Sequence, residues 1–162
     1  EEKIPINLVA FTNDIVHELA PSVTEKGLTI SVNPPSIATS NLFLDKLMLR
    51  QVVMNLVSNA IRYTNNKGTI EIFWSKSDDN REVVYSVSDN GIGIPESQRA
   101  RIFTKFFRAE NALVKAPDGS GLGLALVKDL VESWKGRVWF ETEEGKGTTF
   151  TFTVPLVTDI TI

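Results

Sequence analysis

The spacing of apolar residues along the chain predicts a set of amphipathic helices. Leu8, Ile15, Leu19 and Val23 recur at helical spacing, and Gly27 is a typical helix stop. Three further segments show the spacing of a helix, and the one at residues 95–103 is short. We therefore expect helices over residues 8–26, 45–64, 95–103 and 122–134.

Strands are predicted where apolar and polar residues alternate. In the last of them Phe150, Phe152 and Val154 face one way, and threonines face the other. The polar stretch SDDN and the turn EEGKG each join two strands into a hairpin. The expected strands are residues 28–33, 69–76, 82–88, 137–141 and 148–154. This order predicts an α+β fold, a two-layer α/β sandwich with helices on one face of a mixed, mostly antiparallel sheet.

Composition narrows the possible functions. The 162 residues suit a single domain spanning 1–162, and the lack of cysteine excludes thiol catalysis, zinc-thiolate sites and iron-sulfur clusters. A net charge of -3 without a basic stripe disfavours nucleic acid as a partner. The sequence has neither a transmembrane run nor a signal peptide, so we expect a cytoplasmic domain without direct membrane contact. Both ends resemble cuts, which suggests a piece of a longer protein.

The stretch DNGIGIP follows a predicted strand directly. Asp89 would lie at the strand's end, and Gly91 and Gly93 can adopt positive φ and let the backbone approach a flat ligand. Pro95 stiffens the exit from the loop. Taken alone, an ordinary surface turn would also account for this stretch.

An unusual row of amides runs along the helix predicted at 45–64. Gln51, Asn55 and Asn59 recur every fourth residue, and Arg62 follows, so their side chains form one ridge. Asparagine is a poorer helix former than the lysine and glutamate usual on a solvated face. The ridge is either a tolerated surface or a set of oxygens aimed at a cation such as Mg²⁺ that is shared with substrate phosphates.

A second glycine cluster precedes the last predicted helix. The backbone amides at such a helix start form an anion site. Other nucleotide motifs fail, because a Walker A loop would need glycine at Phe140 and a serine or threonine at Gly147. Neither a Rossmann fingerprint nor the catalytic loops of serine kinases are present. The cluster comprises Gly119, Gly121 and Gly123.

Five stretches together resemble the boxes of sensor histidine kinases, in that family's order. RQVVMNLVSNAIRYT, DNGIGIP, IFTKFFR, GSGLGLALVK and GKGTTFTFTVP resemble its N, G1, F, G2 and final glycine-threonine boxes. The resemblance implies the Bergerat ATP-binding fold, shared with gyrase-type and chaperone ATPases. ATP would lie between the long helix and a lid over residues 109–118.

The resemblance also implies roles for individual residues. Asp89 would accept a hydrogen bond from the adenine amino group, and Thr148 would support the base through water. Asn59, with Asn55 beside it, would bind Mg²⁺. The base would be framed by Gly91, Gly93 and Ile94. Phosphate and nucleoside contacts would come from Arg62, Tyr63 and Arg108, and from the segment Gly119, Ser120, Gly121, Leu122, Gly123 and Leu124.

The implied reaction is transfer of the γ-phosphoryl group of Mg-ATP to a histidine, with Asn55 and Arg108 as catalytic residues. In hydrolysing relatives the position of Asn55 is typically Glu, a base that an amide cannot replace. A neutral imidazole needs no such base near pH 7. Alternatives are a nucleotide-sensing module without kinase activity and an ATPase.

The expected partners are the dimerisation and histidine-acceptor helical domain of the same protein and a response-regulator receiver domain. The parent could be a membrane-anchored sensor with this part in the cytoplasm. His17 is the chain's only histidine, but Pro21 comes one residue too early for an acceptor box and no arginine precedes it. We expect His17 to be an exposed residue of the first helix.

Overall fold

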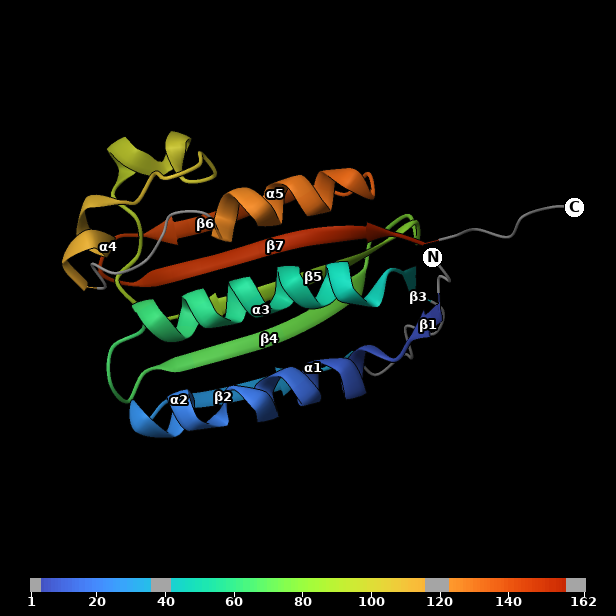
Figure 1. Ribbon diagram of the computed structural model, residues 1–162, viewed down its shortest axis with the longest axis horizontal. Helices are drawn as coiled ribbons and strands as arrows, with labels where there is room; N and C mark the ends of the chain where they lie inside the picture. The colour runs from blue at the N-terminus through green and yellow to red at the C-terminus, as the bar shows by residue number, and fades with distance from the viewer. Residues whose placement is uncertain (1–3, 36–41, 116–122, 157–162) are drawn as a thin grey trace, which may run out of the picture.

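The computed structural model describes residues 4–35, 42–115 and 123–156, and shows a sheet with helices layered on one face (Figure 1). The helices are α1 (Leu8–Glu18), α2 (Ala20–Glu25), α3 (Lys46–Tyr63), α4 (Glu110–Lys115) and α5 (Gly123–Ser133), with a 3-10 helix at Glu96–Arg101. The main sheet contains β2 (Thr29–Asn33), β4 (Thr69–Lys76), β5 (Glu82–Asp89), β6 (Val138–Glu143) and β7 (Gly147–Pro155).

The strand order of the main sheet is β2-β4-β5-β7-β6. The β2–β4 pair is parallel, and every other pair is antiparallel, which confirms the predicted mixed, mostly antiparallel sheet. In this register Asp89, the last residue of β5, lies between Ile70 of β4 and Thr148 of β7. The topology therefore brings a carboxylate and a threonine hydroxyl to one end of the two central strands.

The core lies between the sheet and the helices. Trp74, Tyr85 and Phe152 form a stack of rings on three adjacent strands, with centroids 5.4 Å and 5.2 Å apart. The Tyr85 hydroxyl is buried but bonded to Thr12 Oγ1 of α1 at 2.7 Å, so its polar group is satisfied. Val52 and Leu56 of α3 are fully buried against this layer.

Helix α3 is held at both ends, which sets the direction of its polar ridge. Asp45 caps its start by accepting from the backbone N–H groups of Leu47 and Met48. At its C-terminal end the Lys26 ammonium donates to the carbonyl oxygens of Ile61 at 2.6 Å and Arg62 at 3.2 Å. A cation at this position also interacts favourably with the negative end of the helix dipole.

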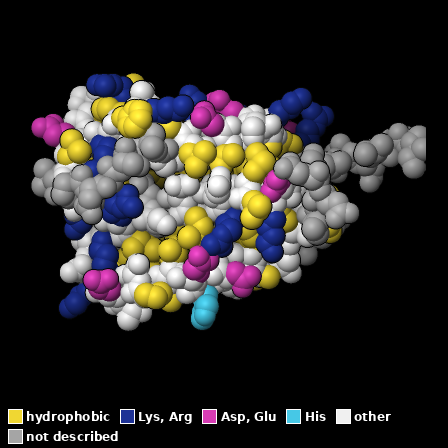
Figure 2. All heavy atoms as spheres, viewed as in Figure 1, with side chains coloured by type: hydrophobic (Ala, Val, Ile, Leu, Met, Phe, Trp, Pro, Cys, Tyr) yellow, Lys and Arg dark blue, Asp and Glu magenta, His cyan; other side chains and the backbone are white. Residues whose placement is uncertain are grey.

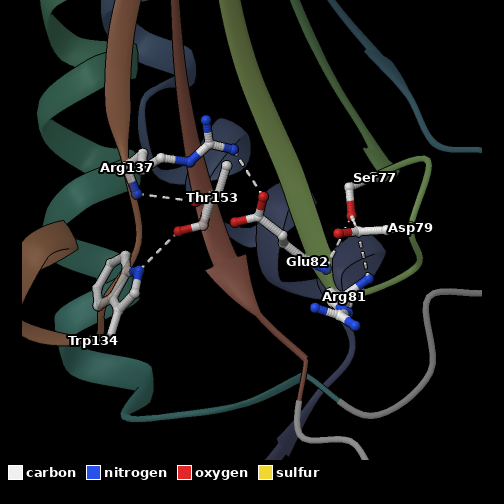
Figure 3. A network of polar contacts seen from close by, with 7 residues as sticks. All are labelled: Ser77, Asp79, Arg81, Glu82, Trp134, Arg137 and Thr153. Atoms are coloured by element: carbon white, nitrogen blue, oxygen red, sulfur yellow. Dashed lines mark hydrogen bonds and ion pairs between the residues drawn. The ribbon is translucent and has the colours of Figure 1, made fainter.

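The end of the sheet formed by the β4–β5 turn is tied to the end of α5 by polar contacts (Figure 3). The indole Nε1 of Trp134 donates to the Thr153 carbonyl at 2.9 Å, and the Arg137 backbone N–H donates to Thr153 Oγ1 at 2.9 Å. Arg137 also pairs with Glu82 at 2.8 Å. In the turn itself Asp79 accepts from Ser77 Oγ at 2.6 Å. The contacts of Trp134 and Arg137 with Thr153 fix the end of α5 on β7.

The structure corrects two local predictions. The helix expected over 8–26 is broken at Leu19 into α1 and α2, because Pro21 occupies the first turn of a new helix and cannot donate within an old one. Two strands of three residues each, β1 (Ile4–Ile6) and β3 (Leu42–Leu44), pair with each other and were not predicted. Three residues are too few to show a period of two.

Candidate functional site

A cavity of about 380 Å³ opens between α3, α4, the start of α5 and the ends of β5 and β7. In Figure 2 lysine and arginine side chains gather at the left end of the molecule, where Figure 1 places α4. The predicted site residues that line the cavity are Asn55, Asn59, Arg62, Tyr63, Asp89, Gly93, Ile94, Arg108, Gly123, Leu124 and Thr148.

Asp89 is held in one orientation at the inner end of the cavity. Its Oδ1 accepts from the backbone N–H of Gly91 at 2.9 Å and from that of Thr148 at 3.3 Å. Burial raises the pKa of this carboxyl to about 6, although both hydrogen bonds act in the opposite direction. Because both hydrogen bonds end on Oδ1, the second oxygen, Oδ2, is available for a donor on a ligand.

The glycine loop after β5 packs closely against other backbone segments. A Cβ on Gly91 would collide with the carbonyl of Tyr63, and one on Gly93 would collide with the carbonyl of Glu143. Gly93 has φ of +67° and lines the cavity, whereas Gly91 is not among the lining residues. Close packing against the end of α3 and against the β6–β7 hairpin requires glycine at both positions.

Thr142 joins the glycine loop to Thr148. Its hydroxyl accepts from the Ile94 backbone N–H at 3.0 Å and lies 2.8 Å from Thr148 Oγ1. Gly145 N–H in the same turn donates to the Ile92 carbonyl at 2.8 Å. The floor of the cavity is therefore held in place by both the sheet and the β6–β7 turn.

The amide ridge of α3 divides into residues inside and outside the cavity. Asn55 Nδ2 donates to the Gln51 carbonyl at 2.7 Å, which leaves Oδ1 close to Gly123 at the start of α5. A Cβ on Gly123 would approach that oxygen to 2.8 Å, so a larger residue there would displace the Asn55 amide. Asn59 lines the cavity one turn further along, while Gln51 is exposed and lies outside it.

The described residues do not gather charged side chains into a metal-binding cluster, although the Asp89 carboxylate lines the cavity. Among residues 4–35, 42–115 and 123–156 there is no cluster of three or more histidine, cysteine, aspartate or glutamate residues that could hold a metal ion. The neutral amides of Asn55 and Asn59 line the α3 side of the cavity. Such a set suits a hard cation only when a polyanionic ligand completes its coordination.

Arg108 lines the cavity and links the C-terminal end of α3 to α4. One guanidinium nitrogen donates to the Tyr63 hydroxyl at 2.8 Å and to the Ala112 carbonyl at 3.2 Å. Tyr63 is the last residue of α3, so this contact joins the long helix to the segment predicted as a lid. Arg108 and Arg62 are the two arginines that line the cavity.

Part of the expected lid is described, and it is helical. Helix α4 is attached by the Glu110 backbone N–H, which donates to Gln98 Oε1 at 2.6 Å, and by Lys115, which donates to Asn65 Oδ1 at 2.9 Å. Residues 116–118 of the predicted lid lie outside the described residues, as do the predicted phosphate contacts Gly119, Ser120, Gly121 and Leu122.

The cavity also contains residues that sequence reasoning missed. Phe107 belongs to the aromatic stretch IFTKFFR, and Ile102 and Phe150 were visible as apolar positions, but periodicity alone could not assign them to a ligand rather than the core. Asn111 gave no sequence signal. The residues missed are Ser58, Ile92, Ile102, Phe107, Ala109, Asn111, Ala112 and Phe150.

Comparison with known proteins agrees with this geometry. The chain is 35% identical over 158 residues to the signal transduction histidine-protein kinase BarA of Escherichia coli K12, covering 96% of this chain and 17% of BarA. It is 37% identical over 112 residues to the sensor histidine kinase WalK of Bacillus subtilis, covering 69% of this chain and 18% of WalK. The chain thus corresponds to a small part of each relative.

Solved structures show the same fold. Full-length ShkA in complex with AMPPNP superimposes with a TM-score of 0.80 at 30% identity, covering 97% of this chain and 32% of ShkA. The nucleotide-free catalytic domain of histidine kinase ThkA superimposes with a TM-score of 0.81 at 25% identity, covering 96% of this chain and 99% of that domain.

Fold and cavity together define an ATP-binding domain of the α/β sandwich type. Residues 44–158 match the family described as histidine kinase-, DNA gyrase B-, and HSP90-like ATPase, and the chain belongs to it as a catalytic domain of the sensor histidine kinase kind. This confirms the predicted family and fold. Within the described part of the chain, no helix has the length and apolarity needed to span a bilayer.

ATP affinity is expected to fall about tenfold between pH 7 and pH 5. The carboxyl of Asp89, with a pKa of about 6, is mostly protonated at pH 5, and the protonated form accepts the hydrogen bond expected from adenine less well. The same shift makes the empty domain less stable as pH rises from about 4 to about 6, since the folded state holds its proton more tightly than the unfolded chain. Calorimetric titration with ATP across this range measures the first effect.

The control for this pH dependence is Asp89→Asn, because the terminal phosphate of ATP also titrates at about pH 6. The variant retains the ionisation of the ligand and lacks that of the carboxyl. An identical pH profile in parent and variant would show that Asp89 does not set the dependence.

Proposed function

We propose that this domain binds Mg-ATP and donates the γ-phosphoryl group to a histidine on a separate helical acceptor domain. The observation that carries the proposal is a cavity lined both by the partly buried carboxylate of Asp89 and by the amide and arginine ridge of α3. ATP has the complementary distribution, with an amino group on its base and negative charge on its phosphates.

The base end of the cavity is suited to adenine. The walls supplied by Ile94, Ile102 and Phe150 are apolar and match a flat heterocycle. Asp89 Oδ2 would accept a hydrogen bond from the exocyclic amino group, and this bond favours the ionised carboxylate. Thr148, whose side chain is buried beside Asp89, would take part through a water molecule.

The phosphate end is suited to a magnesium-bound triphosphate. Asn59 and the Asn55 oxygen beside Gly123 would hold the cation, and Arg62 and Arg108 would contact the phosphates. Mg²⁺, when bound, neutralises charge on the β- and γ-phosphates. Because both amides are neutral, the positive charge of Mg²⁺ would be balanced by the phosphates of ATP rather than by protein carboxylates.

The residues present favour transfer to a nitrogen nucleophile over hydrolysis. Asn55 cannot accept a proton, and Asp89 lies at the opposite, adenine end, so no general base faces the γ-phosphate among the described lining residues. A neutral imidazole nitrogen can attack without one. The new bond joins that nitrogen to the γ-phosphorus, the bond from the γ-phosphorus to the bridging oxygen breaks, and ADP leaves.

The acceptor histidine would come from outside this chain. His17 is exposed on α1, as expected, and stands out from the lower edge of the molecule in Figure 2. It is not among the residues that line the cavity. We therefore assign the acceptor to the dimerisation helices of the parent protein, and the onward transfer to a receiver domain. ThkA has been solved in complex with the response regulator TrrA.

The test is incubation of this domain with γ-labelled ATP, Mg²⁺ and the helical acceptor hairpin of the parent protein. We expect label on the hairpin histidine and little free phosphate. A hairpin with that histidine changed to alanine is the control. ATP binding without labelled hairpin would support a sensing module instead, and rapid release of phosphate by the domain alone would support an ATPase.

A further inference from the structure

Asn111 of α4 holds the glycine loop with one end of its amide and leaves the other end without a partner. Its Nδ2 donates to the Gly93 carbonyl at 2.9 Å and lies 3.5 Å from the Ile92 carbonyl. Its Oδ1 is buried and has no hydrogen-bond partner among the described residues. Asn111 is also one of the residues that line the cavity.

The orientation of this amide is determined by its neighbours. If the amide were turned over, Oδ1 would face the Gly93 carbonyl oxygen at the position now taken by Nδ2, and two acceptors would meet. The nitrogen must therefore point to the glycine loop. The oxygen must therefore point away from that loop, and it belongs to a residue that lines the cavity.

A buried acceptor without a donor is destabilising, so we look for its partner in a group that arrives with the ligand. An amide oxygen only accepts hydrogen bonds, and the ligand group must therefore be a donor. ATP carries such donors only on its amino group and on the two ribose hydroxyls. The amino group is matched by Asp89, which leaves the hydroxyls.

We propose that Asn111 Oδ1 accepts a hydrogen bond from a ribose hydroxyl of the bound nucleotide. This inference rests on the proposed ATP-binding function and deepens it. A residue of α4 then recognises the sugar, while Asp89 at the end of β5 recognises the base. Because the same amide holds the Gly93 carbonyl, sugar recognition and attachment of α4 to the glycine loop are joined in one side chain.

The test compares the binding of ATP, 2′-deoxy-ATP and 3′-deoxy-ATP in the presence of Mg²⁺ by calorimetric titration. In the parent domain, loss of the hydroxyl that Asn111 contacts is expected to weaken binding about 3- to 10-fold, the usual worth of one hydrogen bond. In Asn111→Ala all three nucleotides should bind with the same, weaker affinity.

Gln98→Ala is the matched control for loss of lid attachment. It removes the bond from the Glu110 backbone N–H to Gln98 Oε1 but leaves Asn111 in place. This variant should bind every nucleotide more weakly and retain the preference for the full ribose. A purine riboside triphosphate that lacks the amino group serves as a probe for the base.

Several results would overturn the assignment. One is equal binding of all three sugars by the parent, and another is an undiminished ribose preference in Asn111→Ala. Loss of discrimination against the amino-free purine in Asn111→Ala would assign the oxygen to the base instead. If the parent bound ATP but showed no ribose preference, only this inference would fail, whereas failure to bind ATP would overturn the proposed function as well.

Discussion

Asp89→Asn is expected to weaken ATP binding about 10- to 100-fold, because a partly buried N–H donor of the asparagine would then face the amino group of adenine, which is also a donor. The asparagine Oδ1 can still accept from Gly91 and Thr148, so its Nδ2 takes the place of Oδ2 opposite the adenine amino group. An inosine nucleotide offers an oxygen at this position, and its affinity relative to ATP should rise. Calorimetric titration with both nucleotides measures the effect.

The same change should stabilise the empty domain. At neutral pH the parent holds an ionised carboxylate that burial disfavours, at a cost of up to about 3 kcal/mol for a pKa raised to about 6. Asparagine removes this cost, so the melting temperature should rise by several degrees.

Asp79→Asn is the matched control for both effects. The Ser77 hydroxyl lowers the pKa of Asp79, whose carboxylate is stabilised rather than penalised at the far end of the sheet (Figure 3). That variant should gain no stability and should bind ATP like the parent. If Asp89→Asn bound ATP as tightly as the parent, the adenine assignment would be wrong.

Asn59→Ala is expected to remove most of the thermal stabilisation that saturating Mg-ATP gives to the parent. A ligand at 100 times its dissociation constant adds about 2.7 kcal/mol, which corresponds to a rise of about 5 to 10 °C for a domain of this size. The empty variant should be at least as stable as the parent, because alanine is the better helix former. Thermal unfolding with and without Mg-ATP, and with ATP and EDTA, separates metal from nucleotide effects.

Gln51→Ala provides the comparison on the same ridge. Gln51 lies two turns before Asn59, is exposed and does not line the cavity, and only its backbone carbonyl takes part in the bond to Asn55. Its variant should show the full stabilisation by Mg-ATP. A full shift in Asn59→Ala would instead contradict the magnesium assignment.

Much of the fold could be predicted because its main elements are long enough to show a period. The eighteen residues of α3 carry a clear apolar face, and the hairpin of β4 and β5 was predicted within one residue of its observed limits. Local periodicity contains no information about pairing over long distances. The parallel β2–β4 pair and the small β1–β3 sheet therefore appeared only in the structure.

Some residues of the candidate site could also be predicted from the sequence, and others could not. Asp89, Asn55, Asn59 and Arg108 belong to motifs that could be recognised, and the structure brings them to one cavity. Asn111 lies in a short polar segment whose sequence shows no pattern, and its importance depends on a hydrogen bond to a carbonyl eighteen residues away. Only tertiary contacts could reveal such a residue.

The part of the cavity around Asp89, where we propose that adenine binds, is continuous with the hydrogen bonds of the central sheet. The Asn90 side chain accepts from the Thr69 backbone N–H at 2.8 Å, and Thr148 links Asp89 to β7. This part of the cavity is thus held by the backbone hydrogen bonds of the sheet, which favour a rigid wall. A planar inhibitor that forms a hydrogen bond with Asp89 would bind to a preformed surface. Little entropy would be lost in ordering the protein, and the segment around α4 would not need to close.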